Sequence, residues 1–582
     1  MSEKTVNLKI NNVEITVPEG ATILEAARIG GIEIPTLCYL KEINEIGACR
    51  ICVVEVKGQR SLVAACVFPV TEGMEVQTAS PLVLKSRKLT LELILSTHKR
   101  TCLSCVRSGN CELQRLCNEF KVDEEGYYDG FNYDYEDDDS AVHMKRDNNK
   151  CILCRRCVAA CSHWQSVSVI GTNDRGFSTH IGCAFEKDLG DVPCVSCGQC
   201  IVVCPTGAIY EKDQTDEVWD ALADPTKHVI VQTSPSTRVT LGECFDMPVG
   251  TNVEGKMVAA LRRLGFDGVY DTDFAADLTI MEEAHEFIER VKTGGTLPMI
   301  TSCSPGWVKF CEHQYPEFIP NLSTCKSPQQ MFGAIAKSWY AEQKGIDPKD
   351  IFVVGAMPCT AKKFEVGRDA EETWTQVDVD VALTTREVGR MIQRAGILFT
   401  ELPDEEFDNP FEESTGAAVI FGATGGVMEA ALRNAVDEIT GQDLPNVDYK
   451  EVRGAEGVKE ATYEVGGLTV NVCVASGLAN ARKVLESVKS GEKQYHFIEI
   501  MGCPGGCING GGQPVQPAAV RNFVDLKQAR AVALYDADRS MPLRKSKDSP
   551  LMKMLYKEFL GEPGSPRAHE LLHTHYKKRN RF

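Results

Sequence analysis

Two cysteines near the end of the chain, Cys503 and Cys507, lie four positions apart within residues 498–512, Ile-Glu-Ile-Met-Gly-Cys-Pro-Gly-Gly-Cys-Ile-Asn-Gly-Gly-Gly. Thiolates bind soft metals, and the surrounding glycines have no side chain that would keep the backbone away from a large bound ligand. A short apolar run, expected to form a strand over residues 496–501, precedes the loop. This stretch predicts a metal-cluster site on a loop that follows a strand.

The most specific pattern is a pair of cysteine runs between residues 141 and 212. Each run has the spacing Cys-x2-Cys-x2-Cys-x3-Cys, and Pro205 follows the second run. In bacterial ferredoxins with two 4Fe-4S clusters, the fourth cysteine of each run binds the other cluster. Cys183 belongs to neither set. The predicted ligand sets are therefore Cys151, Cys154, Cys157 and Cys204 for one cluster, and Cys194, Cys197, Cys200 and Cys161 for the other.

Residues 1 to 80 hold four cysteines whose spacing predicts a 2Fe-2S cluster, although the first gap has ten residues where the plant-type pattern has four. Alternating apolar positions also predict a hairpin of strands 6–10 and 13–17, followed by a short helix over 23–28. A zinc ribbon is the alternative, but it requires two Cys-x2-Cys pairs and this segment has one. The predicted ligands are Cys38, Cys49, Cys52 and Cys66.

Residues 81 to 122 begin with a predicted helix over 81–97 and continue with one histidine and three cysteines, His98-x3-Cys102-x2-Cys105-x5-Cys111. By itself this set suits zinc and a 4Fe-4S cluster about equally well. The neighbouring iron-sulfur patterns favour the 4Fe-4S cluster, because redox-inert zinc would interrupt a chain of electron carriers. Cys117 is left over, and we expect it to be a small buried apolar residue.

The composition limits the classes of function. The chain has 582 residues, 43% of them hydrophobic, and a formal net charge of -19, which argues against binding to nucleic acid or an anionic membrane. It shows no leader peptide and no apolar run of the roughly 18 residues that a membrane span needs, so we expect a cytoplasmic protein without a membrane partner. In that reducing compartment its 25 cysteines are expected to be metal ligands and not disulfides.

From about residue 225 onward, apolar strands alternate with amphipathic helices, which is typical of an α/β domain with ligands at the carboxyl ends of its strands. An acidic stretch, 123–139, is expected to be a linker, and the basic stretch 543–582 is expected to be an arm on the domain or an assembly contact. Four segments should then meet at one cavity between two lobes: 233–236, 357–359, 421–426 and 501–512. Strands are predicted over 228–233, 351–356, 417–421 and 496–501, and helices over 255–264, 280–292, 328–343, 385–394, 427–439 and 478–490.

Three long motifs resemble the signatures of FeFe-hydrogenases: Thr301-Ser-Cys-Ser-Pro-Gly-Trp307, Met357-Pro-Cys-Thr-Ala-Lys-Lys-Phe-Glu365 and residues 498–512. The resemblance runs from about residue 3 to 580 and includes the order of the upstream clusters, which is similar to the clostridial type. It implies a multidomain protein of α+β and α/β parts. These are a β-grasp 2Fe-2S ferredoxin domain (1–80), a domain with a 4Fe-4S cluster held by one histidine and three cysteines (81–122), a ferredoxin-like domain with two 4Fe-4S clusters (141–212) and a two-lobed α/β H-cluster domain (225–582).

The resemblance implies an H-cluster, in which a 4Fe-4S cube shares one thiolate with a two-iron unit that carries CO, cyanide and azadithiolate, besides three accessory 4Fe-4S clusters and one 2Fe-2S cluster. Carried over by motif, Cys359, Cys503 and Cys507 hold the cube, and Cys507 is the bridge. The fourth ligand is open: where the family has a second cysteine this chain has Ser304, so Ser304, Cys303 or Cys325 could bind the fourth iron, and Ser304 keeps the register. The expected pocket residues are Lys362, near a cyanide, with Pro235, Ser236, Pro328, Gln329, Met357 and Met501.

The implied reaction is the reversible formation of H2 from two protons and two electrons. Protons then need a path of titratable groups to the surface, and five residues occupy the family's relay positions. Two of them lie three apart, on one face of the predicted helix. Without the resemblance, that pair of carboxylates would more often be a solvated helix face. The relay residues are Cys303, Glu283, Ser323, Glu286 and Arg290.

The expected electron partner is ferredoxin or an equivalent soluble carrier. The chain shows no nucleotide fingerprint, because Gly422-Ala-Thr-Gly-Gly426 only approaches one, so NAD use would require an NADH-oxidising flavoprotein and small iron-sulfur subunits. Hydrogenase maturation factors would assemble the two-iron unit. The alternatives are an H2 sensor and an iron-sulfur electron-transfer subunit without high turnover.

Overall fold

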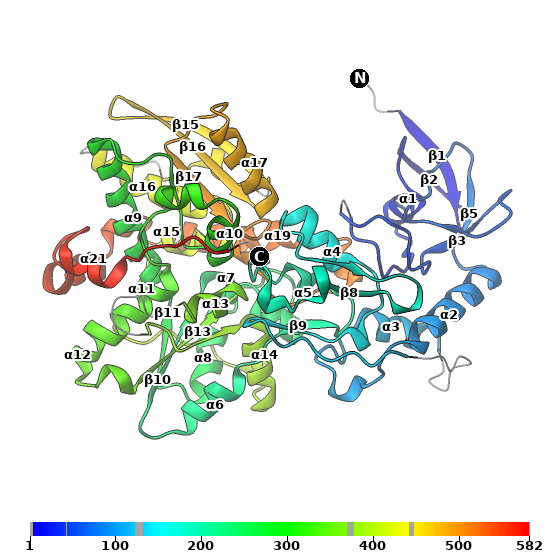
Figure 1. The fold of residues 1–582 in the computed structure, drawn as a ribbon, viewed down its shortest axis with the longest axis horizontal. Coiled ribbons are helices and arrows are strands. Elements are labelled where there is room, and N and C mark those ends of the chain that lie inside the picture. The colour runs from blue at the N-terminus through cyan, green and yellow to red at the C-terminus, as the bar shows by residue number, and fades with distance from the viewer. Residues whose placement is uncertain are drawn as a thin grey trace.

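The structure is a computed structural model that describes residues 4–41, 43–122, 132–368, 377–411, 413–440, 447–454 and 456–580. The small domains that are predicted to bind iron-sulfur clusters form one side of the molecule, at the right of Figure 1, and a large α/β domain forms the other side. This multidomain α+β and α/β organisation is the one predicted from the sequence. No helix within the described ranges combines the length and apolar character that a membrane span requires.

The first domain is a five-stranded sheet with strand order β2-β1-β5-β3-β4, covered by one helix. Asn11 and Asn12, both at positive φ, make the predicted tight turn between β1 and β2. A capping box in which Thr22 and Glu25 bond each other's backbone begins the helix. The elements are β1 (Thr5–Ile10), β2 (Val13–Pro18), α1 (Ile23–Ile29), β3 (Val53–Val56), β4 (Val63–Ala64) and β5 (Glu75–Gln77).

The cluster-binding segments that follow contain little regular structure. The two cysteine runs of the ferredoxin-like domain repeat each other in backbone conformation, because Leu153 and Arg155 in the first run and Ser196 and Gly198 in the second all have positive φ. The internal repeat inferred from cysteine spacing is therefore also a structural repeat. The elements are α2 (Pro81–Ser96), α3 (Glu112–Glu119), β6 (Met144–Arg146), α4 (Arg156–Ala159), β7 (Ile170–Asn173), β8 (His180–Cys183), α5 (Gln199–Val203) and β9 (Ile209–Glu211).

The large domain has two lobes, each built on a four-stranded sheet with helices packed against it (Figure 1). The first sheet, β11-β10-β13-β14, is entirely parallel; the second, β12-β17-β16-β15, is parallel except for β15. The strands of the two sheets are β10 (His228–Thr233), β11 (Gly268–Asp271), β12 (Met299–Ile300), β13 (Ile351–Met357), β14 (Val381–Thr384), β15 (Val458–Val465), β16 (Leu468–Ser476) and β17 (Phe497–Met501).

The predicted helices of this domain all exist, with shifted ends. The helix predicted from residue 280 begins seven residues earlier, and the one predicted over 328–343 contains a π-helical turn at Ala336–Tyr340. The helices are α6 (Thr215–Ala223), α7 (Pro235–Arg238), α8 (Glu254–Leu264), α9 (Asp273–Thr293), α10 (Pro305–Gln314), α11 (Pro328–Ile335), α12 (Ala341–Lys344), α13 (Ala361–Val366), α14 (Thr385–Arg394), α15 (Gly416–Val419), α16 (Gly426–Thr440) and α17 (Leu478–Lys489).

The strand predicted over 417–421 is wrong. This run forms α15 and a 3-10 turn, Ile420–Gly422, because it is buried on all sides and not paired in a sheet. Thr415 begins the helix, with its backbone nitrogen and hydroxyl both donating to the Asp277 carboxylate. A short apolar run has no periodicity that separates a buried strand from a buried helix, so only the packing decided between them.

The C-terminal segment packs on the large domain, as expected for an arm. It contains α18 (Ala518–Arg521), α19 (Leu526–Ser540), α20 (Pro550–Leu555) and α21 (Pro566–Leu572), of which α19 packs against α15 and α21 against α11. Part of the predicted acidic linker, residues 123–131, lies outside the described residues.

Candidate active site

A cavity of about 90 Å³ lies between the two lobes, at the carboxyl ends of β10, β13 and β17. All four segments expected to meet there contribute to its wall. Twelve of the residues singled out from the sequence line it: Pro235, Ser236, Cys303, Ser304, Pro328, Gln329, Met357, Cys359, Lys362, Met501, Cys503 and Cys507.

The glycines of the 498–512 loop serve a different purpose from the one expected. A side chain at Gly506, which has a φ of 98°, would lie 2.7 Å from the backbone nitrogen of Thr424, and one at Gly510 would lie 2.2 Å from the carbonyl oxygen of Pro358. The glycines therefore let three loops pack backbone to backbone. This packing brings Cys503 and Cys507 to the same wall as Cys359.

The donor atoms of the wall fit an iron-sulfur cofactor. Burial, followed by the neighbouring Cys359 thiol, raises the pKa of the Cys507 thiol to about 12, so this sulfur requires a nearby cation to become a thiolate. On another part of the wall, Ser236 Oγ and Gln329 Oε1 are buried without a hydrogen-bond partner among the described residues. A soft thiol wall and unsatisfied polar atoms suit a metal cluster with polar ligands.

Lys362 is fixed at the cavity by three acceptors. Its Nζ lies 2.8 Å from Glu365 Oε2, 2.9 Å from Ser327 Oγ and 3.4 Å from the carbonyl oxygen of Cys303. Glu365 also accepts a hydrogen bond from the Gln329 side-chain amide, at 3.0 Å. Sequence reasoning missed the role of Glu365, although its place three residues after Lys362 on a helix was a usable signal.

The three candidates for the fourth cluster ligand lie in different surroundings. Ser304 lines the cavity, and its Oγ accepts a hydrogen bond from the backbone nitrogen of Gly502, at 3.0 Å. Cys303 also lines the cavity, between Cys507 and the first carboxylate of the expected relay. Cys325 is absent from the cavity wall and has its Sγ 3.7 Å from Glu286 Oε2.

The expected relay residues follow one another from the cavity toward the surface. Burial, followed by the nearby Glu286 carboxylate, raises the pKa of Glu283 to about 8. The Ser323 hydroxyl, which neighbours Glu283, donates to Glu286 Oε2 at 2.9 Å, and Arg290 donates to the other oxygen of Glu286 at 2.6 Å. The Glu286 side chain is 12% exposed, so this pair is not a solvated helix face.

A further buried carboxylate near the cavity was not predicted. Glu499, on β17, accepts hydrogen bonds from the backbone nitrogens of Gly425, at 2.6 Å, and Met428, at 2.7 Å, at the start of α16. An anion is favourable at a helix N-terminus. Burial nevertheless raises the pKa of Glu499. No local sequence pattern pairs a strand residue with that distant helix end.

The ligand sets predicted for the ferredoxin-like domain each line one enclosed cavity. One cavity is lined by Cys151, Cys154, Cys157 and Cys204, and the other by Cys161, Cys194, Cys197 and Cys200, which matches the exchange of fourth cysteines. The second of these lies against the active-site loop, because a side chain at Gly511 would be 2.2 Å from the carbonyl oxygen of Cys197.

The remaining ligand candidates lie in the first two domains. The Cys52 and Cys66 sulfurs are 3.3 Å apart, and the Cys49 backbone nitrogen lies 3.5 Å from the Cys38 sulfur. His98 is partly buried, and its buried Nδ1 lacks a hydrogen-bond partner within the described ranges, as a ligand nitrogen requires. A side chain at Gly207 would meet the Cys105 sulfur at 2.5 Å, so the His98 domain abuts the ferredoxin-like domain.

The leftover cysteines differ in burial. Cys117 is only partly buried and packs against an apolar cluster that also includes Cys111. Its side chain is therefore more exposed than the buried apolar position expected for it. Cys183 is buried in the core of the ferredoxin-like domain, near Arg146.

Comparison with known proteins identifies the family. Residues 227–511 match the family described as the C-terminal domain of the iron-only hydrogenase large subunit. The chain is 50% identical, over 99% of its length and 100% of the relative, to the NADP-reducing hydrogenase subunit HndD of Solidesulfovibrio fructosivorans. The chain belongs to the FeFe-hydrogenase family. Iron hydrogenase 1 of Clostridium pasteurianum is 44% identical over 98% of this chain and 99% of its own length.

Other parts of this FeFe-hydrogenase match further families. Residues 3–81 match a 2Fe-2S cluster binding domain, 87–125 the iron-sulfur binding region of NADH-ubiquinone oxidoreductase G, 150–208 a 4Fe-4S dicluster domain and 524–579 the iron hydrogenase small subunit. Among solved structures, an apo FeFe-hydrogenase of Chlamydomonas reinhardtii has a TM-score of 0.57 and 41% identity, and the match covers 63% of this chain and 100% of that one.

The resemblance inferred from three motifs is confirmed. This protein is an iron hydrogenase that catalyses the reversible formation of H2 from protons and electrons, with accessory domains that relay the electrons. It has an H-cluster domain together with 2Fe-2S and 4Fe-4S domains. The iron-sulfur match over 87–125 favours a cluster over zinc at His98.

Proposed function

We propose that Cys359, Cys503, Cys507 and Ser304 hold the cube of the H-cluster, and that Cys507 bridges to the two-iron unit. The observation that carries this proposal is their common position on one cavity wall, beside buried polar atoms that have no hydrogen-bond partner among the described residues. When bound, the H-cluster supplies the interconversion of H2 with protons and electrons. The protein holds the cofactor, excludes water with the apolar side chains of Met357 and Met501, and moves protons.

Lys362 orients the cofactor as a fixed cation. Its ammonium group is held by Glu365 and Ser327 and so cannot swing out of the wall when the cavity is filled. A cyanide ligand is an anion and a hydrogen-bond acceptor, so the Lys362 ammonium group and the Ser236 hydroxyl, which has no hydrogen-bond partner among the described residues, suit it. Pro235, Ser236 and Pro328 complete the wall on the side of α7 and α11.

Protons move along the series Cys303, Glu283, Ser323, Glu286 and Arg290. The raised pKa of Glu283, about 8, supports this role, because a relay group must hold and release a proton near neutral pH. The Ser323 hydroxyl and the Glu286 carboxylate continue the path with a 2.9 Å hydrogen bond, and Arg290 marks its outer end.

Electrons reach the active site through the accessory clusters. The cluster site of Cys161, Cys194, Cys197 and Cys200 is next to the cube site, since the thiols of Cys359 and Cys503 both lie near Cys197. The outer clusters lie in the domains proposed over 1–80, 81–122 and 141–212, with the catalytic domain over 225–582. The elements support this division, because the first three domains end just after β5, α3 and β9, respectively, and the catalytic domain begins just before β10.

We further propose that the protein is the catalytic subunit of a multisubunit NAD(P)-linked complex. The full-length similarity to a protein named as a subunit of an NADP-reducing hydrogenase supports this, as does the absence of a nucleotide fingerprint from the sequence. A flavoprotein partner would bind the nucleotide, and ferredoxin remains a candidate second carrier. A cytoplasmic location fits these soluble carriers.

The deciding experiment is production of the chain together with hydrogenase maturation factors, followed by infrared spectroscopy. We expect CO and cyanide bands and H2 evolution with a reduced carrier. A Ser236→Ala variant should shift the cyanide bands at unchanged iron content, whereas Ser338→Ala, a serine bonded within its own helix, should not. A matured protein with intact accessory clusters but no such bands would refute the ligand assignment.

Partner use is tested separately. Purification from the native cell should recover a flavoprotein with the chain, and H2-dependent reduction of NAD(P)+ should require it. Purification of the chain alone, with full ferredoxin-linked activity, would contradict the complex and leave the hydrogenase assignment unaffected.

A further inference from the structure

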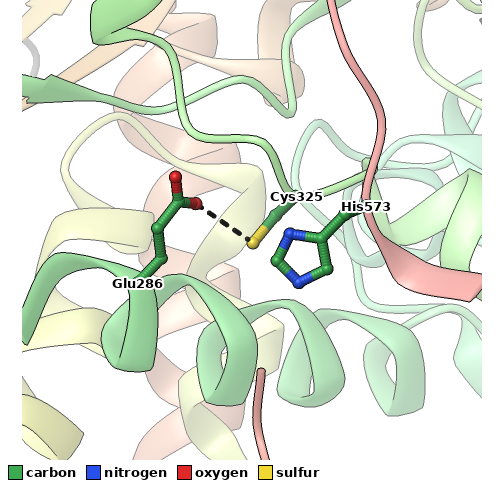
Figure 2. A group of neighbouring side chains, drawn as sticks. All are labelled: Glu286, Cys325 and His573. Carbon is green, nitrogen blue, oxygen red and sulfur yellow. Dashed lines mark hydrogen bonds between the residues drawn. The ribbon is translucent and has the colours of Figure 1, made fainter. Parts of the chain in front are cut away.

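Three side chains from distant parts of the chain meet at the relay residue Glu286: Glu286 itself on α9, Cys325 in the loop before α11, and His573 directly after α21 (Figure 2). One potential ligand atom from each lies within 4.8 Å of the others. A backbone β-bridge between Cys325 and His573 fixes their separation, and the backbone hydrogen bond from Thr574 to Thr324, at 2.7 Å, extends it. The cluster is thus built by the fold.

We propose that Glu286, Cys325 and His573 form an inhibitory binding site for Zn²⁺. A thiolate, an imidazole and a carboxylate are the ligand types that Zn²⁺ prefers, and a fourth position can hold water. In a tetrahedral site with Zn–O near about 2.0 Å and Zn–S near about 2.3 Å, the oxygen and sulfur lie about 3.5 Å apart. Glu286 Oε2 and Cys325 Sγ are 3.7 Å apart, so the ion needs little movement of these side chains.

The histidine already has the orienting partner that a zinc ligand requires. His573 Nε2 lies 3.1 Å from Glu282 Oε2, and the Gly564 backbone nitrogen holds the same carboxylate oxygen at 2.9 Å. A carboxylate on one ring nitrogen fixes the tautomer that presents the other nitrogen to a metal. The other nitrogen, Nδ1, is 2.8 Å from the Thr324 hydroxyl, and this contact is the one that the ion replaces.

The local charge favours a divalent cation. Glu282 and Glu286 carry carboxylate groups on largely buried side chains. The Arg290 guanidinium forms an ion pair with Glu286. Arg290 bonds Glu286 Oε1, whereas Cys325 approaches Oε2, so the metal and the arginine use different oxygens. Binding releases the Cys325 thiol proton to solvent, and the resulting thiolate neutralises part of the metal charge.

A surface histidine of α21 lies directly beside the site. His569 is exposed, and its ring stacks on that of His573 with centroids 4.5 Å apart and planes 3° apart. An exposed imidazole one helical turn away gives an arriving ion a first ligand before it reaches the buried site.

The inhibitory effect rests on the proposed proton path, whereas the site itself rests only on its ligands. Glu286 Oε2, which would bind the metal, is also the atom that accepts the hydrogen bond from Ser323. A Zn²⁺ ion at this oxygen displaces the serine hydroxyl and occupies the lone pair through which Glu286 receives a proton. Zn²⁺ should therefore slow turnover without touching the H-cluster.

The test is a Zn²⁺ titration of the matured holoenzyme, read by zinc K-edge X-ray absorption and by H2 evolution. We expect one bound zinc with a single sulfur at about 2.3 Å and nitrogen or oxygen ligands at about 2.0 Å. Each rate is compared with the same variant's own metal-free rate. Infrared bands and iron content should stay constant through the titration.

Two variants and two controls make the result specific. Cys325→Ser and His573→Gln should each weaken zinc binding and inhibition by at least about tenfold. The controls are His575→Gln, a histidine two residues further on that lies outside the cluster, and Cys311→Ser, a buried cysteine outside the cluster; both should titrate like the parent.

The outcomes separate the site from its effect. No stoichiometric zinc, or zinc with two or more sulfur ligands, would refute the site, since the latter signals exchange into a cluster position. Zinc bound with the expected ligands but without inhibition would refute the inhibitory role and would count against Glu286 as a proton carrier, while the hydrogenase assignment would stand.

Discussion

The Ser304 hydroxyl oxygen lies 3.0 Å from the backbone nitrogen of Gly502, the residue that precedes the cluster ligand candidate Cys503. This hydrogen bond joins the start of α10 to the 498–512 loop and holds the serine oxygen at the cavity wall. An alkoxide would be stabilised by the same N–H group. The geometry therefore suits an oxygen ligand at the position where the family has a cysteine.

Substitution of Ser304 tests the fourth ligand. Because oxygen is a harder donor than sulfur, Ser304→Cys should raise the reduction potential of the cube, and Ser304→Ala should destabilise the cube or change its electron paramagnetic resonance. Redox titration of the matured protein measures both. An alanine variant with an unchanged cube signal would transfer the role to Cys303, and Cys303→Ala would then lose the cube.

Glu283→Gln tests the proton path. Loss of a positioned proton-transfer group costs about a hundredfold or more in rate, so turnover should fall by that factor while iron content and infrared bands persist. The parent's H2 evolution should decline above a pH of about 8, where Glu283 loses its proton. Glu289→Gln, an exposed glutamate on the same helix, is the matched control and should retain the parent's rate and pH profile. A Glu283→Gln enzyme with normal turnover would exclude this carboxylate.

The buried Asp277 carboxyl should make the free energy of unfolding depend on pH. Burial raises the pKa of this carboxyl from its usual 3.8 to about 7 in the folded protein. Its contribution to stability is therefore complete below pH 3.8 and is lost as the pH rises through 7, with a slope of at most about 1.4 kcal/mol per pH unit. Thermal unfolding at pH 5 and pH 8 should show a smaller difference for Asp277→Asn than for the parent. A control at a more accessible carboxylate, Asp220→Asn, should keep the full difference, and an equal difference in both variants would contradict the prediction.

The close contact between Gly511 and the loop of Cys197 and Gly198 tests how the accessory clusters are coupled to the active site. A methyl group at this position would lie 2.2 Å from the carbonyl oxygen of Cys197 and 2.6 Å from the α-carbon of Gly198, so Gly511→Ala must separate the two loops. We expect slower electron delivery from a protein donor and a lower unfolding temperature. Gly171→Ala, which has open space around it, should change neither. An unaffected Gly511→Ala enzyme would show that electrons do not cross at this contact.

Much of the candidate site could be predicted from local patterns. The cysteine spacings separated the ligand sets of the ferredoxin-like domain because each cluster takes its ligands from short turns, and the same turns recur in the structure at residues 153–155 and 196–198. Strand 228–233 and helix 385–394 were predicted with their observed bounds. The strand predicted over 417–421 was wrong because burial on all sides removes the periodicity that distinguishes a strand from a helix.

The sequence by itself determined the family, the domain order and most residues of the cavity wall, because these depend on residue types at short, fixed spacings. Only the tertiary structure decided which distant groups touch. It put Ser304 against Gly502, Glu499 against the start of α16, and Cys325 beside His573, pairs that are 198, 71 or more, and 248 positions apart in sequence. Such contacts arise from how sheets and helices pack, and no local pattern of residues encodes them.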